Sequence, residues 1–356
     1  MSLIWMDGFD AYGTSGSARL VMESSLYVRA GANISNETRT GRGYSILLPW
    51  NSTVGLPNVR KAFDVKGGLI VGFAWKLNAI DRLKEICRFQ YDDHFGTVRS
   101  HLQVNMTADG AVSIGNVADN GSDWVKMADS GPNVLFPNVW HYIEIKVVFG
   151  ENGSVQVRVD NQTCLEATGR TKNPKSPALC NLWRASNYYL EDANYNDTFV
   201  DDLYILDMEG TDFNDFLGDV VIHAVLPNAD GTLNQLSQFG GSLQKYTAVD
   251  DIPPDGDTSY VFGNIIGQQE RYFVDPMPTN VINVLAVSVH ARAKKDAAGA
   301  SNLKLLCKFE DDIALGPVEP VTTQYITRAL MLETAPGGGA WSKAKAEGME
   351  IGFEVA

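Results

Sequence analysis

Residues 138–160 read NVWHYIEIKVVFGENGSVQVRVD, and this stretch decides the fold class of the chain. Between residues 143 and 149 every second side chain is apolar, whereas Glu144 and Lys146 are charged, which is the two-residue period of a strand with one wet face. The alternation stops at 150–153 and then resumes to residue 159. Asn152-Gly153 tolerates the positive φ that a tight hairpin turn requires. The stretch therefore predicts a β-hairpin whose apolar face needs a second sheet opposite it.

Strand signals recur through the first half of the chain about every 10 to 15 residues, without a long helical period. A nearly continuous apolar run at Gly67–Trp75 indicates a strand in the middle of a sandwich. Two alternating segments, 86–91 and 101–106, follow, and Asp109-Gly110 marks a second hairpin turn. Residues 78–85 are compatible with a helical turn or a loop. The prediction is an all-β protein.

The overall composition excludes several classes of protein. The chain has 356 residues, a net charge of −14 and 44% hydrophobic residues, which is ordinary for a globular protein with sizeable cores. A strongly acidic chain does not suit a nucleic-acid backbone, so no nucleic-acid partner is expected. The sequence has no run of about 18 apolar residues and no basic-then-apolar start, so neither a membrane partner nor a secretion signal is expected. The four cysteines are far apart and are expected to be small buried hydrophobes.

The length and the position of a polar seam favour two domains in tandem. The seam is rich in Gly, Asp and Asn and lies within residues 207–219. Further strand-like segments follow it, the longest at Val281–Arg292, together with a short helical pattern at Ala340–Glu347. We predict two β-sandwich (jelly-roll) domains, a first one at 1–208 and a smaller one at 209–356 that serves attachment or oligomerisation.

Three segments of the first half carry a family resemblance. The aromatic opening at Gly8–Tyr12, the hairpin that starts at Asn138, and the closing segment Val200–Tyr204 resemble a concanavalin A-like, laminin G-like jelly roll. The resemblance covers about residues 1–208. It implies that the first and last strands of the domain lie side by side and that the hairpin belongs to the curved sheet.

The second half resembles uncharacterised structural proteins of tailed bacteriophages. The segments that carry this resemblance are 218–231, 255–261 and 350–355. It implies a virion component, assembled in the host cytoplasm, whose partners are other virion proteins, copies of itself and a host-surface glycan. A homo-oligomer with closed symmetry is the general expectation for such a protein.

The sequence lacks the carboxylate pair of the glycan hydrolases that share this kind of sandwich. Retaining hydrolysis needs two carboxyl groups about 5 to 5.5 Å apart, which these enzymes place on one strand as Glu-x-Asp-x-x-Glu. Glu144 is instead followed by Ile145 and Lys146, so it is expected to be a surface residue of a scaffold. Separate acids such as Glu166, Glu191 and Asp192 can still converge in space. The chain is predicted not to be an enzyme.

No metal or cofactor is predicted. Three acidic clusters offer oxygen ligands of the kind that Ca²⁺ prefers, but none has the alternation of an EF-hand loop. We prefer the interpretation that these acids are solvated and cap turns. The clusters are Asp201-Asp202, Asp92-Asp93-His94 and Glu310-Asp311-Asp312.

The candidate contact site is the segment 181–195, which reads NLWRASNYYLEDANY. Aromatic faces can stack on sugars while amides and carboxylates bind the hydroxyl groups. Two interpretations remain open: ligand recognition, or packing of the aromatic side chains beneath the loop or against a neighbouring subunit. The predicted contact residues are Trp183, Arg184, Asn187, Tyr188, Tyr189, Asp192 and Tyr195.

Together these patterns predict a non-enzymatic structural protein of a bacteriophage particle. It would form part of a tail fibre, baseplate, collar or capsid decoration and display a lectin-like surface for assembly or host-surface contact. The alternatives are a stand-alone carbohydrate-binding protein and a glycan hydrolase whose acids the pattern does not identify.

Overall fold

The computed structural model of the chain describes residues 2–14, 18–24, 27–50, 57–80, 82–117, 124–187, 196–299 and 301–356. In these residues strands dominate and helices are few and short, which confirms the all-β prediction. The chain divides into two compact units. The first comprises Met1–Asp10 and Leu26–His223, and the second comprises Ala11–Ser25 and Ala224–Ala356. In this division the seam at 207–219 belongs to the first unit.

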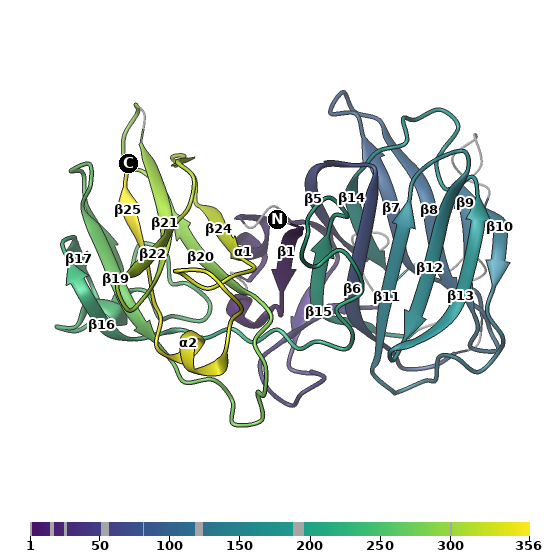
Figure 1. The fold of residues 1–356 in the computed structure, drawn as a ribbon, viewed down its shortest axis with the longest axis horizontal. Helices are drawn as coiled ribbons and strands as arrows, with labels where there is room; N and C mark the ends of the chain where they lie inside the picture. Colours follow the sequence, from purple (N-terminus) through teal and green to yellow (C-terminus); the bar gives the residue numbers. More distant parts are fainter. Residues whose placement is uncertain are drawn as a thin grey trace. The chain divides into compact units, whose positions relative to one another are not determined.

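The first unit contains two antiparallel sheets. Sheet A has the order β13-β12-β11-β6-β15-β4-β3, with β1 also paired to β15 (Figure 1). Its strands are β1 (Leu3–Asp7), β3 (Asn33–Ser35), β4 (Ser45–Leu48), β6 (Gly68–Leu77), β11 (His141–Val148), β12 (Gly153–Val159), β13 (Gln162–Gly169) and β15 (Thr198–Leu206).

Sheet B has the order β10-β9-β8-β7-β14-β5-β2. Its strands are β2 (Tyr27–Ala30), β5 (Asn58–Lys66), β7 (Lys84–Asp92), β8 (Val98–Met106), β9 (Val112–Val117), β10 (Trp124–Asp129) and β14 (Cys180–Ser186). Strand β7 includes residues 84 and 85, and the described residues 78–80 and 82–83 before it are not helical, so they do not support the helical turn that was one of the two interpretations of this segment.

The predicted hairpin lies in sheet A. Strands β11 and β12 pair in register from Ile143↔Val159 to Val148↔Ser154, and β11 pairs on its other side with β6. The second predicted hairpin is also present as β8 and β9. The first strand β1 pairs with the last strand β15, so the two ends of the unit lie side by side as the resemblance implied.

The core of the first unit lies between the two sheets. Phe73 of sheet A meets Trp183 of sheet B edge to face, with 5.2 Å between the ring centroids. Phe149 similarly meets Phe89 at 6.0 Å and His101 at 5.4 Å. Burying aromatic side chains of this size contributes a large part of the stability of such a sandwich.

The chain that follows β15 packs back onto the outer face of sheet A. Glu144 of β11 is 1% exposed, and its Oε1 accepts hydrogen bonds from the Gly218 amide at 2.8 Å and the Tyr204 hydroxyl at 2.5 Å. Lys146 pairs with Asp215 at 3.1 Å. The expectation that Glu144 is a surface residue is therefore wrong, because the returning segment covers it.

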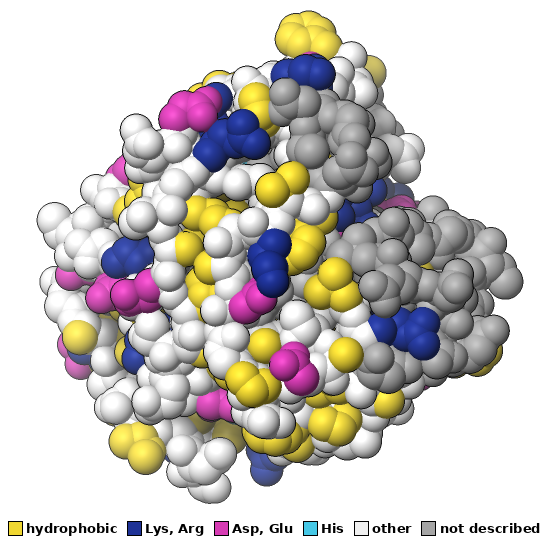
Figure 2. All heavy atoms as spheres, turned by 90° about the vertical axis from the view of Figure 1, so that its right-hand side faces the viewer, with side chains coloured by type: hydrophobic (Ala, Val, Ile, Leu, Met, Phe, Trp, Pro, Cys, Tyr) yellow, Lys and Arg dark blue, Asp and Glu magenta, His cyan; other side chains and the backbone are white. Residues whose placement is uncertain are grey.

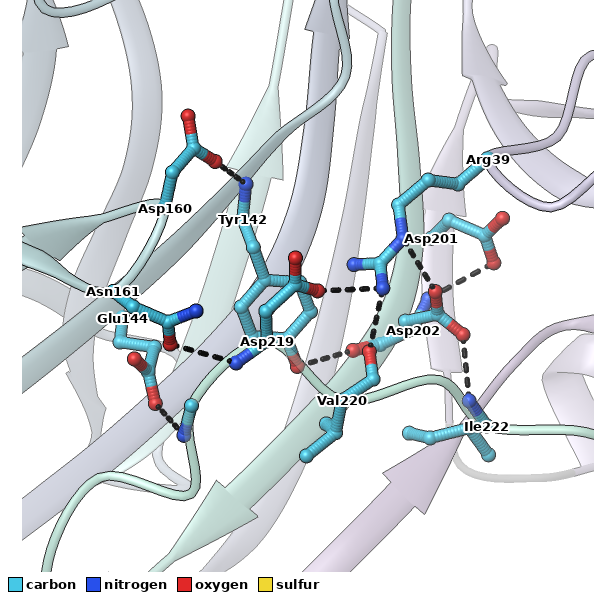
Figure 3. A network of polar contacts seen from close by, with 11 residues as sticks. Arg39, Tyr142, Glu144, Asp160, Asn161, Asp201, Asp202, Asp219, Val220 and Ile222 are labelled. Carbon is cyan, nitrogen blue, oxygen red and sulfur yellow. Dashed lines mark hydrogen bonds and ion pairs between the residues drawn. The ribbon is translucent and has the colours of Figure 1, made fainter. Parts of the chain in front are cut away.

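A network of acids around Arg39 holds the same returning segment (Figure 3). Arg39 pairs with Asp219 at 2.6 Å and with Asp202 at 3.5 Å. Asp202 accepts a hydrogen bond from the Ile222 amide at 2.7 Å and has a φ of 50°. Asp201 and Asp202 lie at a register shift between β15 and β6, and a bulge of this kind redirects side chains. This pair of acids is buried rather than solvated, contrary to our interpretation of the cluster.

Burial of this pair makes the stability of the first unit depend on pH. Burial, followed by the neighbouring charge of Asp202, raises the pKa of Asp201 to about 8 from 3.8. Burial also raises the pKa of Asp202 to about 7, although Arg39 opposes the shift. Between about pH 4 and the raised folded-state values, the folded unit therefore holds protons that the unfolded chain has released. Stability from this source falls as the pH rises through that window.

We expect the thermal midpoint of the wild-type chain to fall between pH 5 and pH 8 by more than that of Asp201→Asn. The side-chain amide of asparagine is neutral throughout, so the variant removes the titration of residue 201. It keeps an acceptor for the backbone amide of Asp202, which in the wild type donates to Asp201 Oδ1 at 2.9 Å. The measurement is circular dichroism melting in matched buffers at both pH values. Equal pH dependence in the two proteins would contradict the assignment.

The second unit contains a six-stranded sheet C and two small sheets, D and E. Sheet C has the order β16-β19-β25-β21-β22, with β23 also paired to β21; β17 pairs with β18 as sheet D, and β20 pairs with β24 as sheet E. The strands are β16 (Pro227–Asn234), β17 (Ser237–Phe239), β18 (Tyr260–Phe262), β19 (Gln269–Val274), β20 (Val287–Ala293), β21 (Asn302–Phe309), β22 (Asp312–Leu315), β23 (Glu319–Pro320), β24 (Ile326–Leu332) and β25 (Glu350–Val355). The helices of the chain are η1 (Asp10–Tyr12), α1 (Ala18–Ser24), η2 (Lys245–Ala248) and α2 (Lys343–Glu347).

Sheet E packs on sheet C, which makes the second unit a smaller two-layer structure. Val287 and Val289 of sheet E share a buried cluster with Cys307 of sheet C and with Trp341. The predicted short helix at 340–347 is present as α2. The predicted strand at 281–292 is shorter than expected, because strand geometry begins only at Val287.

Candidate functional site

The outer face of sheet B carries a continuous set of polar side chains. Phe89, Leu102 and Trp183 point inward from β7, β8 and β14 into the core. Successive side chains of a strand point to opposite faces, so their neighbours Arg88, Gln103 and Arg184 point outward. The candidate site is therefore built on the strands at the centre of the sheet and not on a loop.

One row of this face crosses six strands in register. Arg60 of β5 is paired with Arg184 of β14, Arg184 with Arg88 of β7, and Arg88 with Gln103 of β8. Gln103 is paired with Gly115 of β9, and Gly115 with Lys126 of β10. Neighbouring strands lie about 4.8 Å apart, so the row is about 24 Å long. We call these six residues the cationic row.

A second polar row lies beside the cationic row and is centred on Glu85. The pairing of β7 with β8 shifts between Glu85 and Cys87, which places Glu85 on the same face as Arg88. Glu85 has no exposed surface, and its carboxylate accepts hydrogen bonds from Arg88 and from the Ser186 hydroxyl, the latter at 2.6 Å. Arg184 Nε lies 3.8 Å from the same carboxylate. Glu85 therefore holds both central arginines of the cationic row in place.

An aromatic ring lies over the cationic row at Gly115. A Cβ atom at this position would lie 2.5 Å from Nε1 of Trp124 and 2.4 Å from the carbonyl oxygen of Val125. Glycine is therefore required here, because any side chain would displace the indole from the face of the sheet. The cationic row and Trp124 together present guanidinium groups, an amide and an indole.

Several buried polar atoms of this face have no hydrogen-bond partner among the described residues. They are Nε of Arg88, Oε1 of Gln90, Nδ2 of Asn105 and Nε1 of Trp124. Buried polar atoms in proteins are almost always paired, and an unpaired one costs about 1 to 3 kcal/mol. Water molecules or small shifts of the side chains can complete these hydrogen bonds.

The charge of this face differs from that of the whole chain. Asp129 of β10 belongs to the row of Glu85, because Glu85 is paired with Asn105, Asn105 with Ser113, and Ser113 with Asp129. The two rows hold Arg60, Arg88, Arg184 and Lys126 against the carboxylates of Glu85 and Asp129, in a chain with a net charge of −14. The side chains of Arg88 and Arg184 are 13% and 12% exposed, so only a small part of each reaches the surface of the sheet. Guanidinium groups bind carboxylates through paired hydrogen bonds, so the face suits an anionic ligand.

The end of the first unit next to this face is not uniformly acidic. Figure 2 shows basic and acidic side chains interspersed there with hydrophobic ones.

The structure separates the residues of the predicted contact site. Trp183 has no exposed surface and packs on Phe73, so its prediction as a contact residue is wrong. Asn187 is also buried, and its side-chain amide donates to the carbonyl oxygens of Leu48 at 2.7 Å and Asn196 at 2.9 Å. Its role is to join two segments of the unit. Arg184 remains a candidate contact residue, now as part of the cationic row. The predicted contacts Tyr188, Tyr189, Asp192 and Tyr195 lie outside the described residues.

The sequence contained a signal for the cationic row that the prediction did not use. The segments at 86–91 and 101–106 were recognised as alternating strands, and their polar positions are Arg88, Gln90, Gln103 and Asn105. Polar side chains at alternate positions indicate the outward face of each strand. These positions can be aligned into a row only when the order of the strands in the sheet is known.

One of the acidic clusters considered as calcium ligands caps a turn. Asp93 accepts hydrogen bonds from the amides of Phe95 and Thr97, at 2.8 Å and 3.0 Å, and so caps a turn as expected. Among the described residues, no group of three or more His, Cys, Asp or Glu side chains is arranged to hold a metal ion. No helix in the described part of the chain is long and apolar enough to cross a membrane.

Comparisons with known proteins find similarity at the level of structure alone. No protein-family model matches the chain, and no curated protein matches it in sequence. An endo-β-1,4-glucuronan lyase from the fungus Trichoderma reesei matches 51% of this chain and 88% of its own, at 10% identity and a TM-score of 0.37. An alginate lyase from Chlorella virus matches 53% of this chain and 96% of its own, at 14% identity and a TM-score of 0.39. A carbohydrate esterase from the Shiga toxin-encoding bacteriophage phi24B matches 57% of this chain and 99% of its own, at 13% identity and a TM-score of 0.37.

These comparisons correct the predicted function. We expected a non-enzymatic structural protein of a bacteriophage particle, whereas the structures found to be similar include polysaccharide lyases and a carbohydrate esterase. Both the structural role and the absence of enzymatic activity are therefore wrong as predictions. Location in a virion and assembly with other virion proteins stay predictions.

Proposed function

We propose that this protein is a carbohydrate-active enzyme that binds an acidic polysaccharide along the cationic row of sheet B. The observation that carries the proposal is the in-register alignment of Arg60, Arg184 and Arg88 on three adjacent strands. Three guanidinium groups at a spacing of about 4.8 Å offer repeated contacts to a polymer that carries a carboxylate on successive sugars. Trp124 offers an aromatic surface to the same polymer, and Gln103 offers an amide for hydroxyl groups.

The polar contacts within the site favour a pre-organised surface. Arg88 donates to Gln103 at 2.6 Å and to Ser100 at 3.2 Å, in addition to its contact with Glu85. Gln103 in turn donates to Asn105 at 2.7 Å. These bonds hold long side chains in one orientation, so less conformational entropy is lost when a ligand binds.

The spacing of the carboxylates in the polar rows does not suit hydrolysis by a carboxylate pair. The two carboxylates of the polar rows are Glu85 on β7 and Asp129 on β10, three strand spacings or about 14 Å apart. This exceeds the roughly 5 to 9.5 Å that hydrolysis by two carboxyl groups requires. In elimination, a base removes the proton next to a uronate carboxylate, and the electron pair then expels the glycosidic oxygen, which takes up a proton. Arg88 and Arg184 would stabilise the negative charge that develops on the carboxylate.

The test is incubation of the full chain with polyuronates and, in parallel, with a neutral glucan. We expect retention of the polyuronate alone in affinity electrophoresis, weaker retention at high salt, and a rise in ultraviolet absorbance from the unsaturated sugar that elimination produces. New reducing ends without this absorbance would show that the chain hydrolyses the polymer and does not act by elimination. Equal retention of the neutral and acidic polymers would contradict the assignment of binding to the cationic row. Retention with no change of either polymer would remove the enzymatic part of the proposal.

A further inference from the structure

The second unit contains an exposed aromatic face that the proposed function does not use. Phe239 of β17 is paired with Tyr260 of β18, and Ser237 is paired with Phe262. Paired residues and residues two apart on a strand share one face of a sheet, so the three rings lie on the same side of sheet D. Tyr260 lies 5.1 Å from Phe239 and 5.9 Å from Phe262 between ring centroids.

The rings of this face are substantially exposed. Phe239, Tyr260 and Phe262 are 53%, 36% and 51% exposed. The turns that follow the two strands add exposed aliphatic side chains, those of Leu243, Ile265 and Ile266. A fully buried aromatic side chain covers about 150 to 250 Å², so the six side chains together expose on the order of several hundred Å² of apolar surface. That summed area is comparable to the largest apolar patches of monomeric proteins and approaches the roughly 800 Å² that each partner buries in a stable protein interface.

The same surface is free of charge. Neither residues 234–244 nor residues 258–269 contain an Asp, Glu, Lys or Arg, although the chain as a whole has a net charge of −14. Two copies of such an acidic chain repel each other over most of their surfaces. A neutral apolar patch is where two like-charged copies can approach closely. These two segments offer no cation to an acidic polysaccharide, and their aliphatic side chains do not form hydrogen bonds with sugar hydroxyls.

Sheet D also lacks a covering layer on this side. Its two strands have three residues each, and η2 packs against both of them. A two-stranded sheet is marginally stable unless its apolar face is covered. A second copy would supply that layer, with the ring face of one sheet D packed against the ring face of the other.

We infer that the ring-bearing face of sheet D is the interface of a homodimer of this chain. The contact is isologous, because the same patch serves both copies across a two-fold axis. The inference stands apart from the proposed function, since the cationic row belongs to the first unit.

The experiment measures the mass of the full-length chain by size-exclusion chromatography with light scattering and by sedimentation over a range of concentrations. We expect a dimer at about 10 µM and a monomer for the double variant Phe239→Asp, Phe262→Asp, because two aspartates per copy place four negative charges in the interface. Raising the salt from about 0.05 M to about 0.3 M should strengthen the wild-type dimer, since screening weakens the repulsion between the acidic copies.

The matched control is Phe95→Asp, which changes a 95% exposed phenylalanine of the first unit by the same chemistry. This variant should remain dimeric, and the far-ultraviolet circular dichroism of all three proteins should agree. The inference is overturned if the wild type is monomeric at about 100 µM or if the double variant remains dimeric. If the wild type is monomeric and the double variant also loses retention on a neutral polysaccharide, the rings form a sugar site instead of an interface.

Discussion

Trp183→Ala is expected to lower the free energy of unfolding of the first unit by about 3 to 5 kcal/mol. Trp183 has no exposed surface, and its indole fills the space between the two sheets against Phe73. Removing it leaves a cavity that the surrounding strands cannot close, because β14 is held on both sides by β5 and β7. The measurement is equilibrium unfolding in urea, monitored by circular dichroism.

The control for this variant is Trp50→Ala. Trp50 is 45% exposed, so its loss should cost no more than about 1 kcal/mol. A second readout is binding of polyuronate to folded Trp183→Ala, which should change little, since the side chain points away from the cationic row. Normal stability combined with lost binding would restore Trp183 as a contact residue and contradict its place in the core.

Arg184→Gln is expected to weaken binding of an acidic oligosaccharide by about 10- to 100-fold. The variant removes a charged donor from the middle of the cationic row, and a hydrogen bond that involves a charged group contributes about 1.5 to 3 kcal/mol. Arg184 is preferred over Arg88 for this test. Arg88 donates directly to the buried Glu85, and its removal would leave that carboxylate with too little compensation and destabilise the fold.

The matched control is Arg158→Gln on sheet A. It changes the net charge of the chain by the same amount, but Arg158 lies against Phe216, with its guanidinium 5.0 Å from that ring, on the face covered by the returning segment. Isothermal titration calorimetry with a uronate oligosaccharide should give wild-type affinity for Arg158→Gln. If both variants lose the same affinity, the effect of charge is general and the cationic row is not the binding site.

Trp183 and Arg184 show why the candidate site could be predicted only in part. They are consecutive residues of one strand, so they necessarily point to opposite faces of sheet B. We predicted both as contact residues of one loop because aromatic and polar residues lie close together in that segment. The pairing of β14 with β5 and β7 separates them, since one face is sealed by sheet A and the other is not.

Glu144 illustrates the same difference on the other sheet. Its alternation with Ile143 and Ile145 correctly predicted a residue on the polar face of a hairpin. The alternation could not predict that residues 209–222 return to cover that face and supply the Gly218 amide as a partner. Contacts over such a separation in the chain leave no periodic pattern in the local sequence.

By itself, the sequence determined the all-β class, the hairpin at 143–159 and the side of the strand on which each residue of that hairpin lies. Those features depend on the two-residue period and on turn residues, which are local properties of the chain. Only the tertiary structure decided which polar side chains form one site. Arg60, Arg184 and Arg88 come from three strands far apart in the sequence, and their alignment depends on the order and register of those strands. That order is set by the packing of the whole sandwich, and for this reason no single stretch of the sequence contains it.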